Sequence, residues 1–159
     1  MANQSLHTLI QQGLSALKAG SDVAAKATDD ILSDATYPAL KAALEQGNQR
    51  SKQWDERIKQ ARHEAGEEGR EENPILEAHF EVSKKIRRQA SDDYSRDLGI
   101  IASGQQALHY WIAAFGTLRT YAAQAGLHQT QHAMQACLDE AKQADEEHTQ
   151  IAEQILRTK

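Results

Sequence analysis

Apolar residues recur at intervals of three and four along four long stretches of this 159-residue chain, and this spacing constrains the fold most. It places the apolar side chains on one face of an α-helix. Aromatic residues make up only 5% of the chain, while Ala, Gln, Glu, Leu and Lys are abundant, which favours helix over sheet. The clearest stripe comprises Leu98, Ile101, Leu108, Trp111, Ile112, Phe115, Leu118 and Ala122. We therefore predict an all-α protein.

Capping signals predict where the first two helices begin. Ser5 is the expected N-cap of the first, whose stripe runs to Ile31 across a weak point at Gly20. A break follows at 33–37, and Pro38 occupies the first position of the second helix. That helix fades into residues 62–73, which are charged and lack an apolar period.

Similar signals predict the remaining helices. Asn73 and Pro74 begin a shorter helix that ends near Gln89. Ser91 is the expected cap of the third long helix, which ends at Gly126, and the fourth begins near residue 129. Short connections make two antiparallel hairpins, so we predict a single-domain four-helix bundle over 1–159, with the short helix in a crossover at about 62–91.

Composition excludes several classes of partner. The net charge of −5 gives no general attraction to nucleic acid. The basic run at 84–88 is interpreted as a solvated helix face, the alternative being a phosphate or RNA contact. No apolar run approaches the ~18 residues of a membrane span, and residues 1–20 lack a signal-peptide pattern. We therefore expect no membrane partner and a cytoplasmic location.

Cys137 is the only cysteine, so no intrachain disulfide can form, which suits a reducing compartment. It lies on an apolar helical stripe between Met134 and Ala141. Nothing nearby in the sequence would lower its pKa, so we predict a buried structural thiol rather than a nucleophile.

Three segments resemble a known family. They are GQQALHYWIAAFGTLRTYAAQAG at 104–126, LDEAKQADEEH at 138–148 and PALKAALEQ at 38–46, and HYWIAAFGTLR is the most specific phrase. Over most of residues 15–155 the chain resembles the YciE/YciF-type ferritin-like stress proteins. The resemblance implies a ferritin-like bundle, a homodimer and expression under osmotic or oxidative stress.

The resemblance also implies where the family's di-metal site would lie. Such a site needs inward-facing Glu and His residues from all four helices, with carboxylates that bridge the ions. The family's Asp is retained here as Asp145. The family's other ligand positions carry different residues in this chain: Ser21, Gly47, Arg50, Leu108, Trp111 and Ala141.

The apolar pattern agrees with the loss of these ligands. Leu108 and Trp111 share the stripe of Ile112 and Phe115, so we expect them to point inward and to fill the former chamber. Without a metal, each buried and unpaired carboxylate would cost on the order of several kcal/mol in desolvation free energy. We therefore expect no metal and no cofactor, a buried Trp111, and Ala141 facing it or within one turn of facing it.

Some metal-ligating side chains remain. Asp145 and His148 have the spacing of half a di-metal motif, and with His109 they form an alternative weak site for Fe or Mn. Without a metal, Asp145 should pair with His148, His109 or an Arg. His128 and His132 share a helix face but lack a third ligand, and Tyr110 and Tyr121 are interpreted as core or interface aromatics.

Two interpretations follow. The favoured one is a non-catalytic stress-response bundle, a structural or protein-interaction protein with an unknown protein partner. The alternative is an iron- or manganese-binding oxidoreductase or metal-storage protein with a rearranged site around Asp145 and His148. A homodimer is expected in part from large aromatics placed near helix surfaces: Tyr37, Trp54, Tyr94 and Tyr121.

Overall fold

The computed structural model describes residues 2–67 and 69–158. Within them the chain forms five α-helices and no strand, which confirms the all-α prediction. The helices are α1 (Ala2–Asp34), α2 (Pro38–Glu64), α3 (Pro74–Gln89), α4 (Asp93–Ala125) and α5 (His128–Leu156). None of these described helices is long and apolar enough to cross a membrane.

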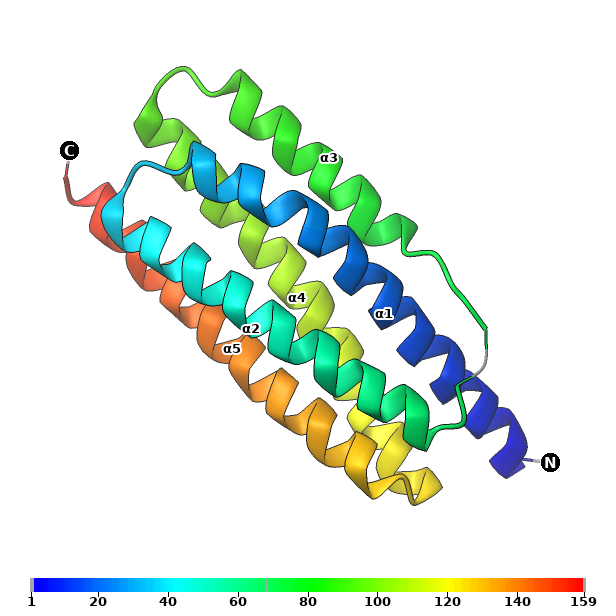
Figure 1. Cartoon of the computed structure of the whole chain (residues 1–159). Coiled ribbons are helices and arrows are strands. Elements are labelled where there is room, and N and C mark those ends of the chain that lie inside the picture. The colour runs from blue at the N-terminus through cyan, green and yellow to red at the C-terminus, as the bar shows by residue number, and fades with distance from the viewer. Residues whose placement is uncertain (1, 68, 159) are drawn as a thin grey trace.

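The four long helices form a closed ring of neighbours. Helix α1 packs against α2, α2 against α5, α5 against α4, and α4 against α1. Residues 35–37 join α1 to α2, and residues 126–127 join α4 to α5, so each of these pairs is an antiparallel hairpin (Figure 1). Helix α3 lies in the crossover between the hairpins and covers the side formed by α1 and α4. This is the predicted bundle.

Two predicted helix starts are wrong. Helix α1 begins at Ala2 rather than after Ser5, because a good capping residue does not prevent the helix from extending further towards the N-terminus. Helix α4 is capped by Asp92 rather than Ser91. The Asp92 carboxylate accepts from the backbone N–H of Ser95, and the Ser95 hydroxyl oxygen accepts from the backbone N–H of Asp92. These two bonds form a capping box at Asp92.

The remaining predicted signals agree with the structure. Asn73 caps α3 and accepts from the Leu76 backbone N–H at 3.0 Å, and Pro74 is the first residue of that helix. Gly126 ends α4 in the left-handed conformation, with φ of 74°.

Gly20 permits a close approach between α1 and the start of α3. A Cβ atom at this position would lie 2.7 Å from Asn73 Nδ2 and from Leu76 Cδ1. Asn73 itself is buried and donates to the Ala16 carbonyl at 2.9 Å and to the Tyr110 hydroxyl at 2.7 Å. Helix α1 is continuous at Gly20, so the predicted weak point does not interrupt it. The glycine instead leaves room for the start of α3.

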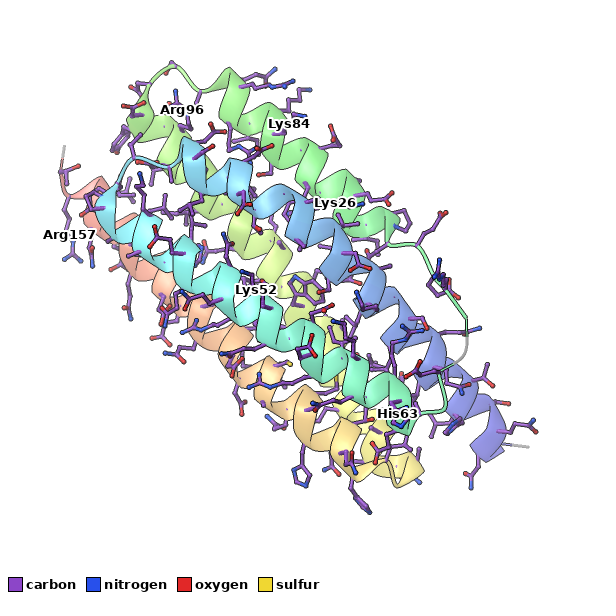
Figure 2. The ribbon with its side chains drawn as sticks, in the orientation of Figure 1. Lys26, Lys52, His63, Lys84, Arg96 and Arg157 are labelled. Carbon is purple, nitrogen blue, oxygen red and sulfur yellow. The ribbon has the colours of Figure 1, made fainter. Side chains whose placement is uncertain are left out.

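The buried apolar residues form two clusters. The larger spans all five helices and includes Trp54, Leu76, Trp111, Phe115 and Ala141. The smaller lies around the α1–α2 connection and includes Leu40, Ile100 and Ile151. Lys52 on α2 and Lys84 on α3 lie on the outside of the bundle, as Figure 2 shows.

Candidate functional site at the centre of the bundle

A cavity of about 130 Å³ lies in the middle of the bundle, and residues from all five helices line it. The lining includes four of the six family ligand positions that carry a different residue in this chain: Gly47, Arg50, Leu108 and Trp111. Ser21 and Ala141 lie outside the lining. Ser21 donates from its hydroxyl to Asp55 Oδ1 at 3.0 Å, and Ala141 is completely buried in the same core cluster as Trp111.

Trp111 is buried, as predicted, with 6% of its surface exposed. Its ring stacks on Phe115 at a centroid distance of 5.4 Å and is tilted against Trp54 at 5.9 Å. Tyr110 meets Trp111 edge-on at 5.5 Å. These contacts make the surroundings of Trp111 an aromatic core.

The prediction that Leu108 and Trp111 fill the chamber is wrong, because the cavity remains beside them. The space persists on the α2 side, where Gly47 has no side chain. A Cβ atom built on Gly47 would meet no other atom within 4 Å. Two large residues on α4 therefore do not replace the volume that a ligand side chain on α2 would occupy.

Asp145 was predicted to face the centre of the bundle, and this prediction is wrong. Its carboxylate lies between α4 and α5 with 22% of the side chain exposed, and Oδ2 is 3.0 Å from Nε2 of the exposed His109. The other oxygen, Oδ1, is buried and accepts no hydrogen bond from the described residues. Asp145 does not line the cavity, whereas Ala144, Glu147 and His148 of the same helix do.

His148 lies apart from the Asp145–His109 pair. It is buried, and its Nδ1 is 2.8 Å from the Ala144 carbonyl oxygen of the same helix. A carbonyl can only accept, so Nδ1 carries the proton. The three residues of the alternative weak site are thus divided between two places. His79 of α3 also lines the cavity, and its Nε2 donates to the Ser103 carbonyl at 2.7 Å.

The only ion pair on the cavity lining, within the described residues, joins Arg50 to Glu147 with an N–O distance of 3.5 Å. The two charges cancel, and most of the remaining lining is apolar. Among residues 2–67 and 69–158, no three His, Cys, Asp or Glu side chains are grouped so as to hold a metal ion. A di-metal centre needs bridging carboxylates, so the residues present do not fit one.

Two polar groups with strong partners were missed by the sequence analysis. Asp97 is 3% exposed and accepts from the backbone N–H groups of Thr36 and Tyr37, at 2.9 and 2.8 Å, and from the Thr36 hydroxyl at 2.7 Å. It therefore fixes the α1–α2 connection. Its position, four residues before Ile101 on the inward stripe, was the signal that could have identified it.

The second missed group is Glu140 of α5. It accepts from the Trp54 indole N–H at 2.7 Å and from both terminal nitrogens of Arg57, at 2.8 and 3.1 Å. Burial alone would raise the pKa of Glu140, but the bonds from Arg57 and Trp54 outweigh it and hold the pKa below its usual range. No sequence pattern links residues 54 and 140, which are far apart along the chain.

Other candidate residues take structural or surface positions. Cys137 is fully buried, and burial raises the pKa of its thiol to about 11 against the opposing effect of Arg57, so the thiol is unreactive at neutral pH. His128 and His132 are exposed on the first turns of α5. Arg87, in the basic run, is buried and pairs with Asp34 at 2.8 Å. This pairing makes one residue of that run structural.

The helix arrangement defines a ferritin-like bundle, here with an apolar centre. The chain belongs to the family described as Domain of unknown function (DUF892), whose profile matches residues 5–159. YciF of Escherichia coli K12 is 31% identical over 77 residues, which are 48% of this chain and 46% of YciF. The alignment thus spans about half of YciF, and it supports the resemblance to YciF-like proteins.

Two solved structures share the fold. The crystal structure of the E. coli stress protein YciF matches with a TM-score of 0.92 and 22% identity, and the match covers 97% of this chain and 98% of that chain. YcfI from Rhodopseudomonas palustris matches with a TM-score of 0.86 and 22% identity, covering 91% and 92% of the two chains. At this identity the likeness shows the ferritin-like bundle and nothing finer.

Proposed function

We propose that this chain is a non-catalytic ferritin-like bundle that acts in a stress response as a structural or protein-interaction protein, and that it has lost the family's di-metal site. One observation carries the proposal. Gly47, Leu108 and Trp111 line the centre where the family resemblance places ligands, and none of them supplies a ligand atom. The stress-response part rests on membership of the family and the similarity to the E. coli stress protein YciF.

The charged groups near the centre support the same proposal. Arg50 stands at a position where the family resemblance places a carboxylate, and it pairs with Glu147. A cation at this place repels a divalent metal ion instead of binding it. The one retained family ligand, Asp145, is paired with His109 outside the cavity lining.

The test is the metal content of protein purified without chelators, then incubated with Fe²⁺ or Mn²⁺ and desalted. We expect no more iron or manganese than in an Asp145→Ala variant treated in the same way. Metal bound in proportion to protein, and lost from the variant, would replace this proposal with the metal-binding alternative.

We also propose a homodimer, supported by the family resemblance. Trp54 does not contribute to an exposed aromatic surface, because it is 6% exposed and belongs to the core. The large apolar residues that are exposed include Ile75 and Val82, at 64% and 50%, which lie seven apart on α3. Light scattering at micromolar concentration should give the mass of two chains, and the mass of one chain would contradict the dimer.

A further inference from the structure

The central cavity has the size and lining of a small-molecule site. Its volume is about 130 Å³, and Trp54, Trp111, Leu108 and Phe80 contribute apolar surface from three helices. Apolar cavities of about 150 Å³ in other proteins stay free of water and bind single-ring molecules such as benzene. The present cavity is of similar size and is partly open, so it can accept a single aromatic ring.

The charges on the lining exclude an ionic ligand. Arg50 and Glu147 face each other with an N–O distance of 3.5 Å, so each already has an opposite charge beside it. A charged ligand would have to break this pair or remain uncompensated in a mostly apolar environment, and both are costly. The ligand that fits is uncharged.

The buried histidine on the lining has one ring nitrogen without a hydrogen-bond partner among the described residues. His148 uses Nδ1–H to donate to the Ala144 carbonyl, so in the neutral ring Nε2 carries a lone pair and can only accept. This Nε2 lies 3.5 Å from where a Cβ atom of Gly104 would be, so the glycine leaves the space over it open. Among the described residues, His148 forms its hydrogen bond through Nδ1, and none is formed by Nε2. A ligand with one hydroxyl donor would satisfy it.

We propose that the central cavity binds a small uncharged aromatic alcohol of the phenol type, whose ring packs against Trp54, Trp111 and Leu108 and whose hydroxyl donates to His148 Nε2. This proposal rests on the proposed function, because a metal centre in the same space would leave no room for the ring. The former metal site would then serve as a binding site for an organic molecule.

Phenol and toluene are the matched probes, since they have nearly the same shape and differ in the hydroxyl. Calorimetric titration of the full-length protein, with a chelator present, should show one site per chain for each. Gly47→Leu should weaken both by about tenfold or more, because its side chain enters the open space beside α2. Replacing a helical glycine also favours the helix, so this variant should fold.

The hydroxyl contact is tested by comparing the affinities of the two probes. His148→Phe should change the ratio of phenol to toluene affinity by about 2- to 12-fold in favour of toluene, which corresponds to one hydrogen bond. His132→Phe, an exposed histidine of the same helix, is the control and should leave the ratio unchanged. In the unmodified protein, the ¹⁵N resonance of His148 Nε2 should shift on addition of phenol and stay in place with toluene, and this readout needs no variant.

Three results would overturn the proposal. The first is that neither probe binds at its solubility limit. The second is that Gly47→Leu leaves both affinities unchanged, and the third is that the His148 Nε2 resonance responds equally to both probes. Because the titrations are made with a chelator present, these failures leave the metal-free function standing. Stoichiometric metal in the untreated protein would instead contradict the proposed function.

Discussion

Two buried regions of this bundle differ in whether they contain a buried carboxylate at the positions compared. At the α1–α2 connection, the carboxylate of Asp97 is buried and accepts three hydrogen bonds, from Thr36 and Tyr37. At the centre of the bundle, Gly47, Leu108 and Trp111 occupy positions where the family resemblance places metal ligands. The chain thus has a buried carboxylate at the α1–α2 connection, whereas the three central positions carry no metal-ligating side chain.

The difference teaches what a buried carboxylate requires. Its desolvation is costly unless donors or cations compensate it. Backbone N–H groups of the connection supply that compensation for Asp97, and they are present whenever the chain is folded. In a di-metal bundle the ions supply it instead. Without the ions, apolar residues are the more stable occupants, and a chain that has lost its metal is expected to lose the ligands with it.

The largest expected effect concerns the apolar region. Trp111→Ala should lower the free energy of unfolding by about 3–5 kcal/mol, because it enlarges the existing cavity and removes the ring contacts with Trp54 and Phe115. Chemical denaturation measures this. Leu156→Ala, at a site 54% exposed, is the control and should change stability by less than about 0.5 kcal/mol. A cost for Trp111→Ala as small as that of the control would mean that the centre is not a packed core.

The polar region should respond to the loss of its carboxylate. Asp97→Ala leaves three donors of the α1–α2 connection, on Thr36 and Tyr37, without their acceptor and should cost about 1–3 kcal/mol. Asp145→Ala removes a carboxylate from a pair whose histidine is 67% exposed, so about 0–1 kcal/mol is expected. Urea unfolding of both variants gives the comparison. Equal costs would remove the distinction between compensated and partly exposed carboxylates.

A smaller, pH-dependent effect is expected at Glu140. Its folded pKa is lowered from the ordinary value of 4.5, so its contribution is complete above that pH and is lost as the pH falls through the folded pKa. Glu140→Gln should cost about 1 kcal/mol at pH 7, a modest value because the carboxylate is partly exposed. Thermal unfolding measured from neutral to acidic pH should show the difference from the unmodified protein shrink below pH 4.5. A constant difference across that range would contradict the assignment.

The smallest expected effect has the opposite sign. Gly47→Ala should stabilise the protein by about 0.5–1 kcal/mol, because the methyl group enters open space and the helix loses a flexible residue. Gly20→Ala is the matched contrast and should destabilise, since its Cβ would lie 2.7 Å from Asn73 and Leu76 atoms. Melting temperatures of the two variants should move in opposite directions. A loss of stability in both would show that Gly47 is also in a closely packed place.

Local signals were sufficient to predict most of the fold. The Pro38 and Pro74 starts, the Gly126 end and the inward stripe through Trp111 each depend on a few neighbouring residues, and the structure has all of them. The errors at Ser5 and Ser91 arose where more than one residue could begin the helix. In α4, the choice of Asp92 depended on the reciprocal bond with Ser95.

The candidate site was less predictable, because it depends on which helix faces meet. The stripe predicted that Trp111 points inward, but the volume left at Gly47 depends on the distance between α2 and its neighbours. Asp145 and His148 are three residues apart on one helix. His148 lines the cavity, whereas Asp145 lies outside the lining and pairs with His109. The contacts of Glu140 with Trp54 and Arg57 join distant parts of the chain, which no local pattern records.

The most direct test of the central claim is anomalous diffraction from crystals soaked in Fe²⁺ and, separately, in Mn²⁺, with data collected at each metal's absorption edge. The claim is that the centre of the bundle no longer holds metal. We predict no anomalous peak between the four long helices. An ordered ion there, with Asp145 and His148 as ligands, would contradict the account, and the iron- or manganese-binding function would take its place.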